Sequence, residues 1–290
     1  MRKYLRLARV YQYPKNVFVL FPIFFSGFLT DWSKVIKIIW GFLCFCFLSS
    51  VVYILNDIKD AESDRNHPVK KNRPIANGSV STAKAYILAG ILLFFSILIE
   101  LIFFSDNLLT LVFTGTYLLL NILYSVKLKN IPIIDILILA SGFVIRVLFG
   151  AAIIGVEVST WLYLTVLSIS LFLALGKRRN EYKNSTSLGS TRKCLKKYSY
   201  EYLDKMMYMF AALAIVFYSL WCINNTIIIQ NISTEMMWSI PFVIAIVMRY
   251  CFDIESDSHG DPTDVIINDK VLLGICASFV IYITSVMYIL

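Results

Sequence analysis

The sequence predicts an all-α, polytopic membrane protein that crosses the bilayer with about nine transmembrane helices. Of its 290 residues, 58% are apolar and only 16% are charged, a bias that soluble domains rarely reach. The apolar residues form blocks of about 17–25 residues, the length of helix that spans a bilayer. No separate soluble domain is expected, so residues 1–290 are predicted to form a single transmembrane domain. The expected spans are 14–30, 36–55, 84–104, 108–125, 132–155, 159–176, 206–228, 236–252 and 271–290.

The distribution of cations predicts the orientation of the chain. The N-terminal arm and the loops after the second, fourth, sixth and eighth spans hold all but three of the 27 lysine and arginine residues. Because cytoplasmic loops are enriched in these residues, we expect the N-terminus and the charged loops in the cytoplasm and the C-terminus outside. The formal net charge of +8 fits this topology and anionic substrates, and it requires no nucleic acid as a partner.

The charged segment after the second span carries the strongest functional signal. Three aspartates, Asp57, Asp60 and Asp64, follow one another at helical spacing. If the helix continues through the last of them, their side chains and that of Asn56 fall within a sector of about 100°, and Glu62 points elsewhere. Mg²⁺ suits such oxygen ligands, because it binds one or two carboxylates together with substrate phosphate oxygens. The segment therefore predicts a Mg²⁺ site, and the alternative is a solvated loop of mixed charge.

Two further pairs of polar residues lie at the end of a span or within one. Tyr124 and Lys129 close the fourth span on the cytoplasmic side, where an interfacial tyrosine and topology lysines are the alternative to a functional role. Asp135 and Arg146 lie about three turns apart on one predicted helix, so they face the same way. A charge inside a span is costly and marks a functional site by default, and a structural ion pair with another helix is the alternative.

Two charged clusters follow the sixth and eighth spans. Lys177 and Arg178 stand in a Gly-Lys-Arg-Arg sequence, and an arginine fork matches phosphate oxygens. Such a cluster also stops a span at the cytoplasmic face, which is the alternative. The acidic segment Asp253–Asp264 would hold another metal or order a loop over the site.

With these features the chain resembles the UbiA superfamily of intramembrane prenyltransferases, which carry Asn-Asp-x-x-Asp-x-x-x-Asp after the second span, here residues 56–64. Within that superfamily it more closely resembles the decaprenyl-phosphate phosphoribosyltransferases. The motifs that point to this group are Gln12–Asn16, His67–Pro68, Arg73–Ala76, Gly176–Arg178 and Gly260–Pro262. Tyr13 departs from the tryptophan of many relatives. Aromatic prenyltransferases would carry a second Asp-rich motif after the sixth span, where this chain has Lys177–Arg179.

The resemblance implies helices around a central intramembrane cavity, in an integral protein of the bacterial cytoplasmic membrane whose active site faces the cytoplasm. The implied reaction transfers 5-phosphoribose from phosphoribosyl diphosphate to a membrane polyprenyl phosphate and releases diphosphate, with Mg²⁺ as cofactor, for the synthesis of cell-envelope glycan precursors. The residues implied in catalysis, as metal ligands, are Asp57, Asp60 and Asp64. The residues implied in substrate binding are Lys15, Asn56, His67, Lys70, Arg73, Tyr124, Lys129, Arg146, Lys177 and Arg178.

Two other functions stay open at this point. A UbiA-type aromatic prenyltransferase would use a polyprenyl diphosphate as the donor rather than phosphoribosyl diphosphate. A transporter or channel would fit the many spans and the intramembrane Arg146, but it has no need of three carboxylates on one cytoplasmic face. The oligomeric state also stays open, a homo-oligomer included.

Overall fold

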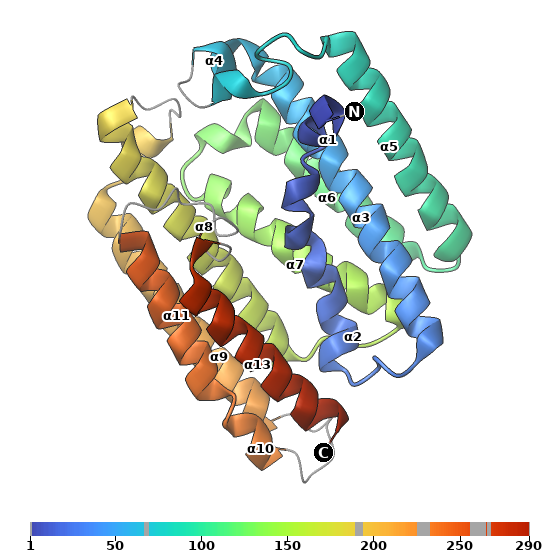
Figure 1. Cartoon of the computed structure of the whole chain (residues 1–290), viewed down its shortest axis with the longest axis vertical. Helices are drawn as coiled ribbons and strands as arrows, with labels where there is room; N and C mark the ends of the chain where they lie inside the picture. Colours follow the sequence, from blue (N-terminus) through green and yellow to red (C-terminus); the bar gives the residue numbers. More distant parts are fainter. Residues whose placement is uncertain are drawn as a thin grey trace. The chain divides into compact units, whose positions relative to one another are not determined.

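The computed structural model describes residues 2–66, 70–188, 194–224, 233–255, 265 and 268–289, and all regular structure within these ranges is helical (Figure 1). Eight helices in this part of the chain are long and apolar enough to cross a membrane. The predicted all-α class is confirmed, and so are the spans from the second onward, with bounds shifted by a few residues. Contacts divide the chain into two compact units, Met1–Ile138 with Ile145–Glu157 and Leu139–Val144 with Val158–Leu290. The single domain and the central cavity stay predictions.

The first unit is built around one long helix, α3. α3 packs along α5 and also contacts η1 and α6. Phe45 on its buried face packs against Phe149 in the core, with the two rings tilted and their centroids 5.4 Å apart. The Asp31 side chain accepts hydrogen bonds from the backbone N–H groups of Ser33 (3.0 Å) and Lys34 (3.4 Å), which caps the helix start. The elements of this unit are α1 (Arg2–Leu7), η1 (Val10–Leu20), α2 (Phe21–Phe25), α3 (Trp32–Lys59), α4 (Ala61–Arg65), η2 (Lys70–Asn72), α5 (Thr82–Phe103), α6 (Leu108–Val126), η3 (Leu128–Asn130) and both ends of α7 (Ile134–Ile154).

The segment predicted as the first span, 14–30, differs from one long α-helix. Its first part belongs to the 3₁₀ helix η1, which contains Pro14, and its second part is the five-residue helix α2, which has Pro22 in its first turn. η1 continues through Pro14, and the segment divides between Leu20 and Phe21, beside Pro22. Proline lacks the backbone N–H that a continuous α-helix would use. η1 approaches α7 closely, because a Cβ atom at Gly150 would lie 2.0 Å from the carbonyl oxygen of Val19. Only glycine permits this packing.

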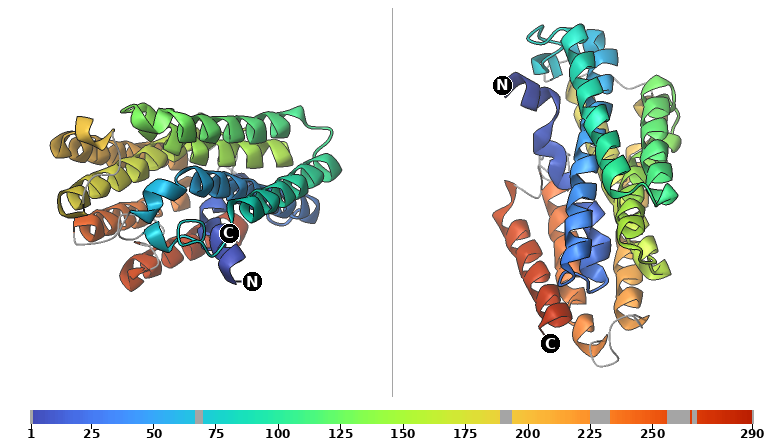
Figure 2. Two further views of the ribbon diagram at one scale, coloured as in Figure 1. Left: turned by 90° about the horizontal axis from the view of Figure 1, so that it is seen from above. Right: turned by 90° about the vertical axis from the view of Figure 1, so that its right-hand side faces the viewer.

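The second unit consists of long helices that lie beside one another (Figure 2). α8 packs along α9, and α11 contacts both α9 and α13. The elements are α8 (Thr160–Leu188), η4 (Leu195–Lys197), α9 (Tyr200–Asn224), α10 (Ser233–Met237), α11 (Ile240–Glu255) and α13 (Lys270–Tyr288).

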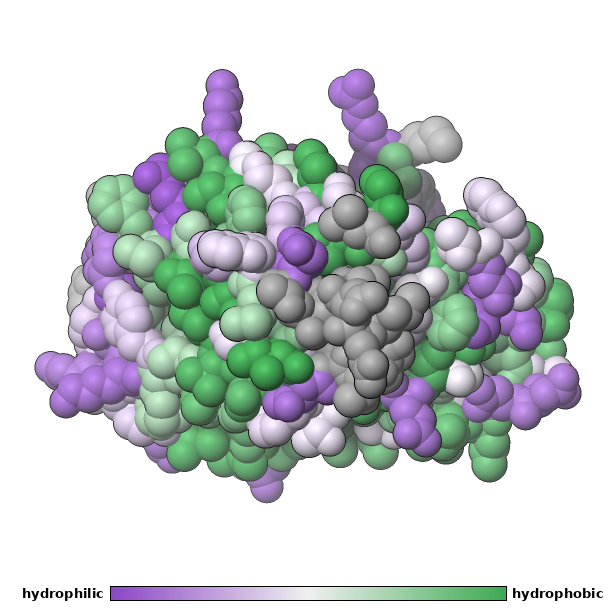
Figure 3. Space-filling model, turned by 90° about the horizontal axis from the view of Figure 1, so that it is seen from below, coloured by the Kyte–Doolittle hydropathy of each residue, from purple (hydrophilic) through white to green (hydrophobic). Residues whose placement is uncertain are grey.

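Large apolar side chains are exposed on the long helices of both units. Phe94 on α5 is 61% exposed, Met248 on α11 is 67% exposed and Ile281 on α13 is 67% exposed. Apolar residues are also widespread on the face drawn in Figure 3. A soluble protein rarely exposes so much contiguous apolar surface, whereas the hydrocarbon of a bilayer accommodates it. The chain is an integral membrane protein.

Candidate active site

The three predicted aspartates lie where α3 ends and α4 begins. α3 ends at Lys59, Asp60 has φ −90° and ψ 2°, and α4 begins at Ala61. The Asp64 N–H still donates to the Asp60 carbonyl oxygen (2.9 Å), so the chain keeps a helical course through the interruption. Asp57 and Asp64 are 2% and 4% exposed, whereas the Asp60 side chain is 33% exposed. The uninterrupted helix on which the sequence argument depended is therefore broken at the middle aspartate, which lies in a wetter environment than the other two.

Arg73 joins the two buried carboxylates. Its Nη1 lies 2.6 Å from Asp64 Oδ2 and 3.2 Å from Asp57 Oδ1. One guanidinium atom thus touches both side chains, so Asp57 and Asp64 do share a face, as the spacing predicted. Buried like charges require such a counter-ion, since two bare carboxylates would repel each other strongly at this distance.

Arg9 is a second cation on Asp57, and the sequence argument missed it. Its Nη2 donates to Asp57 Oδ1 (2.5 Å), and its guanidinium carbon lies 4.9 Å from the ring centroid of Tyr53. Burial is the largest single influence on the pKa of Arg9 and works to lower it, but Asp57, Tyr11 and Tyr53 together outweigh burial, so the pKa is raised above the ordinary value. The backbone at Arg9 is left-handed (φ 50°, ψ 46°), a conformation that costs a non-glycine residue about 1–2 kcal/mol. The ion pair helps to offset that cost.

Asp60 and Asn56 are linked to the segment that follows α6. Lys129 Nζ in η3 lies 2.7 Å from Asp60 Oδ1, and the Ser125 hydroxyl donates to the Asn56 side-chain oxygen. The structure therefore brings six of the predicted site residues together around the end of α3, where Arg9 and Ser125 join them. The predicted members are Asn56, Asp57, Asp60, Asp64, Arg73 and Lys129, of which Asn56 joins through its hydrogen bond rather than through an ion pair.

The carboxylate oxygens of Asp57 and Asp64 suit Mg²⁺, which needs only one or two carboxylates from the protein. Among the described residues, no three His, Cys, Asp or Glu side chains are placed to share one metal ion. Asp57 and Asp64 are nevertheless close enough together for both to contact the Arg73 guanidinium. Mg²⁺ characteristically uses one or two carboxylates plus substrate phosphates and water. Two buried, oxygen-only ligands are therefore a sufficient protein contribution. Asp60, paired with Lys129, follows Asp57 by three residues and precedes Asp64 by four.

Arg146 lies deeper in the span region than the carboxylate cluster. Its Nε donates to Asn16 Oδ1 (2.8 Å) and its Nη2 to the Tyr117 hydroxyl (3.2 Å). Asn16 in turn donates to the Ser49 hydroxyl of α3 (3.2 Å), and Ser49 precedes Asp57 by about 12 Å along the helix. The guanidinium also lies over the Phe45 ring, with 4.9 Å to the centroid. Arg146 is thus held about two turns below the carboxylates by polar and aromatic groups from η1, α3 and α6.

The remaining predicted residues of the first unit lie near these elements. Tyr124 is buried at the end of α6, and Lys15 and Lys70 are half-buried in η1 and η2. Asp135, at the start of α7, is fully buried. His67 lies outside the described residues.

The Gly-Lys-Arg-Arg cluster belongs to the second unit. Arg178 is fully buried and its Nη1 lies 2.6 Å from Glu181 of the same helix. Arg179 pairs with Asp204 on α9 (2.6 Å) and with Glu255 on α11, so it ties three helices together. The contacts thus separate Arg178, which pairs within its own helix, from Arg179, which pairs with two other helices. The part that Lys177 and Arg178 play toward substrate stays a prediction.

The acidic segment after the eighth span is partly described. Arg249 Nε lies 2.5 Å from Asp269 and 3.6 Å from Asp253, and Glu255 holds Arg179. These acids therefore balance arginines within the unit. The other acids of Asp253–Asp264 lie outside the described residues, so the second metal stays a prediction.

Comparison with known proteins points to one family. The sequence model of the UbiA prenyltransferase family matches residues 19–222. A decaprenyl-phosphate phosphoribosyltransferase of Corynebacterium glutamicum is 32% identical over 99% of this chain and 87% of its own length. The enzyme of the same name from Mycolicibacterium smegmatis is 34% identical over 92% of this chain and 87% of its own. Among solved structures, a UbiA homologue from Archaeoglobus fulgidus bound to GPP and Mg²⁺ superimposes with a TM-score of 0.71 at 20% identity, covering 98% of this chain and 99% of the other.

Proposed function

The chain belongs to the UbiA prenyltransferase family, and on that premise we propose that it is a polyprenyl-phosphate phosphoribosyltransferase. It transfers 5-phosphoribose from phosphoribosyl diphosphate to a membrane polyprenyl phosphate and releases diphosphate. The proposal depends mainly on the similarity to two enzymes named for this activity, which are 32% and 34% identical to the chain over 99% and 92% of its length. The product would feed the synthesis of cell-envelope glycan precursors.

The carboxylate cluster is the proposed donor site. Asp57 and Asp64 are the metal ligands of the proposal, with Asp60 beside them, and Mg²⁺ bound there would neutralise the diphosphate leaving group. Arg9 contacts Asp57 and Arg73 contacts both Asp57 and Asp64, so both arginines would stand next to a diphosphate that the metal holds. Their planar forks match phosphate oxygens.

The acceptor needs no strong general base. A phosphate monoester has a second pKa of about 6, so it is already largely ionised near neutral pH. Its oxygen attacks C1 of the ribose, the new C1–O bond forms, and the bond from C1 to the diphosphate oxygen breaks with its electron pair. Positive charge develops at C1 on the way, as in other glycosyl transfers. Arg73, Lys177 and Arg178 are the proposed phosphate contacts, without assignment to a particular phosphate group, and Tyr124, Lys129 and Arg146 are proposed as pocket wall.

The proposed topology places this chemistry at the cytoplasmic face. The cations that surround the carboxylates belong to the loops that the positive-inside rule assigns to the cytoplasm. Phosphoribosyl diphosphate would thus enter from the cytoplasm, and the lipid would arrive within the bilayer. The N-terminus is proposed to lie inside and the C-terminus outside.

A reconstitution tests the proposal. Purified protein is incubated with phosphoribosyl diphosphate, Mg²⁺ and a polyprenyl phosphate, and the lipid is analysed by mass spectrometry. The proposal predicts a lipid heavier by one phosphoribosyl group, formed only when both substrates are present. If the protein instead prenylates an aromatic acceptor from a polyprenyl diphosphate and forms no phosphoribosyl lipid, it is an aromatic prenyltransferase.

A further inference from the structure

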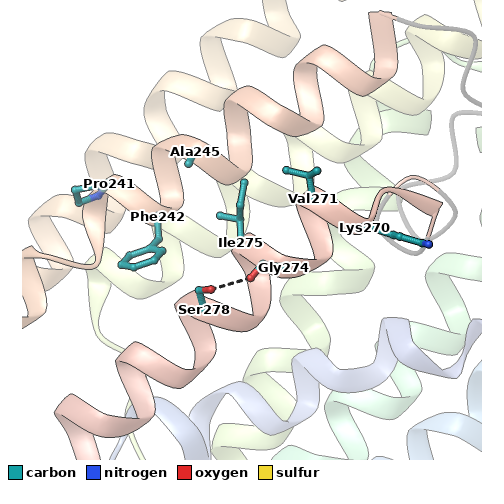
Figure 4. Close-up of a pocket in the computed structure, with 8 residues that line it drawn as sticks. All are labelled: Pro241, Phe242, Ala245, Lys270, Val271, Gly274, Ile275 and Ser278. Carbon is teal, nitrogen blue, oxygen red and sulfur yellow. Dashed lines mark hydrogen bonds between the residues drawn. The ribbon is translucent and has the colours of Figure 1, made fainter.

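A groove runs between α11 and α13 in the second unit (Figure 4). Its volume is about 490 Å³. Phe242 of α11 and Ile275 of α13 form apolar walls, and the small residues Ala245 and Gly274 leave room between them. The Ser278 hydroxyl, which also lines the groove, already donates to the Gly274 carbonyl oxygen (2.9 Å). The middle of the groove therefore offers an apolar surface to an occupant.

One end of the groove carries a cation. Lys270 is the one charged residue of the lining and is exposed. The neighbouring carboxylate of Asp269 is paired with Arg249 at 2.5 Å, so its charge is already balanced. Within the described residues, no carboxylate lies within ion-pair distance of Lys270. The groove thus combines an apolar channel with a positive charge at its end.

The direction of the groove matches the depth of a bilayer. Arg249 of α11 pairs with Asp269 just before α13, and Phe242 stacks on Tyr282 with 5.6 Å between ring centroids, so the two helices run antiparallel. From Lys270 to Ser278 the groove extends about 12 Å along α13. In the proposed topology Lys270 lies at the cytoplasmic interface and Ser278 lies toward the middle of the membrane.

We propose that this groove is a docking site for a polyprenyl phosphate, with the phosphate at Lys270 and the first isoprene units along α11 and α13. The inference rests on the proposed function, because it identifies the occupant as the acceptor lipid of that reaction. A gap between two helices that contact each other takes one slender chain more readily than the two chains of a phospholipid. A phosphate monoester also carries about −1.5 to −2 charges, so Lys270 at the interface attracts it more strongly than it attracts a phosphodiester, which carries about one.

Gly274 allows a direct test. A Cβ atom built at this glycine meets nothing within 4 Å, so a side chain has open space where it leaves the backbone, and Gly274→Leu adds bulk to the lining of the groove. Ala277 is exposed on the same helix and is not part of the lining, so Ala277→Leu adds a comparable bulk elsewhere. Lys270→Gln removes the charge alone.

The experiment uses the full-length protein in phosphatidylcholine nanodiscs with a photoreactive polyprenyl phosphate that carries a diazirine near its phosphate. Labelled peptides are located by mass spectrometry, and unlabelled polyprenyl phosphate or phosphatidylglycerol is added as a competitor. We expect labels on α11 and α13. Gly274→Leu should reduce them about tenfold, the loss expected when about two methylene groups are displaced from an apolar site. Lys270→Gln should reduce affinity about fivefold, and Ala277→Leu should label as wild type does.

The outcomes separate this inference from the proposed function. Labelling that Gly274→Leu leaves unchanged, or that phosphatidylglycerol suppresses as well as polyprenyl phosphate does, overturns the docking site even if the reconstituted enzyme makes phosphoribosyl lipid. If no phosphoribosyl lipid forms, the proposed function fails whatever the label pattern is. Labels that disappear in Gly274→Leu, persist in Ala277→Leu and resist phosphatidylglycerol support the inference.

Discussion

Substitution of Arg73 should change the affinities for the metal ion and for phosphoribosyl diphosphate in opposite directions. Its guanidinium touches Asp57 at 3.2 Å and Asp64 at 2.6 Å, so in the absence of substrate it competes with a metal ion for the same oxygens. In the proposed reaction the same side chain binds the diphosphate. Arg73→Gln should therefore tighten divalent metal binding and weaken the binding of phosphoribosyl diphosphate.

The geometry bounds both effects. The Asp64 side chain is 5% exposed and Arg73 is 27% exposed, so the pair lies between a surface ion pair, worth about 0.2–1 kcal/mol, and a buried hydrogen bond to a charged group, worth about 1.5–3 kcal/mol. A value of about 1–2 kcal/mol predicts metal affinity that is about 5- to 30-fold higher in Arg73→Gln. Loss of a charge-assisted contact to the donor predicts a KM about 10- to 150-fold higher.

Two measurements on the same preparations decide the matter. Mn²⁺ titration followed by electron paramagnetic resonance gives the metal affinity without substrate, and the lipid-product assay gives KM for phosphoribosyl diphosphate. Arg65→Gln is the matched control, because Arg65 is exposed one residue from Asp64, and both values should change less than about twofold. Metal affinity that falls or stays constant in Arg73→Gln would refute the assignment of Asp57 and Asp64 as the metal ligands.

Four further outcomes are expected. Asp57→Asn should lose nearly all turnover with its helical circular dichroism intact, whereas Glu62→Gln, whose side chain is exposed, should keep it; the reverse order would contradict the ligand assignment. Arg146→Lys keeps the charge but not the planar fork, so kcat/KM should fall about tenfold or more, and normal kinetics would place this residue outside the site. Arg179→Gln should lower the free energy of unfolding by about 1–3 kcal/mol and leave the KM for phosphoribosyl diphosphate unchanged. A higher KM with unchanged thermal stability would instead identify Arg179 as a substrate contact. In cysteine-free protein, a cysteine at Ser187 should react with an impermeant thiol reagent only in opened membranes, and reaction in intact cells would reverse the proposed topology.

Much of the carboxylate cluster follows from local spacing. Asp57 and Asp64 lie about two turns apart, and that spacing alone predicts that they share a face. The prediction was less accurate for Asp60, because the α-helix stops there. The Ser63 hydroxyl donates to the Asp60 carbonyl oxygen (2.9 Å), and short polar side chains of this kind compete for backbone groups and favour helix ends over helix interiors.

Other contacts depend on tertiary packing that no sequence period encodes. Arg9 contacts Asp57, which lies 48 residues away in sequence, and its backbone is left-handed. No local motif indicates this contact, so the sequence predicts for Arg9 only a contribution to the orientation of the chain in the membrane. Arg178 and Arg179 are adjacent in sequence, yet one pairs within its own helix and the other ties α8 to α9 and α11. Composition and length were enough to predict the eight confirmed spans, whereas the segment predicted as the first span divides into η1 and α2 beside Pro22.

The central claim is that the acceptor phosphate attacks C1 of the donor, and isotope tracing tests it directly. Polyprenyl phosphate labelled with ¹⁸O in its non-bridging phosphate oxygens is incubated with unlabelled phosphoribosyl diphosphate, Mg²⁺ and the purified protein. The account predicts that the phosphoribosyl lipid retains every ¹⁸O atom and that the released diphosphate contains none. Label in the diphosphate, or a lipid product that lacks the ribose 5-phosphate, would contradict it.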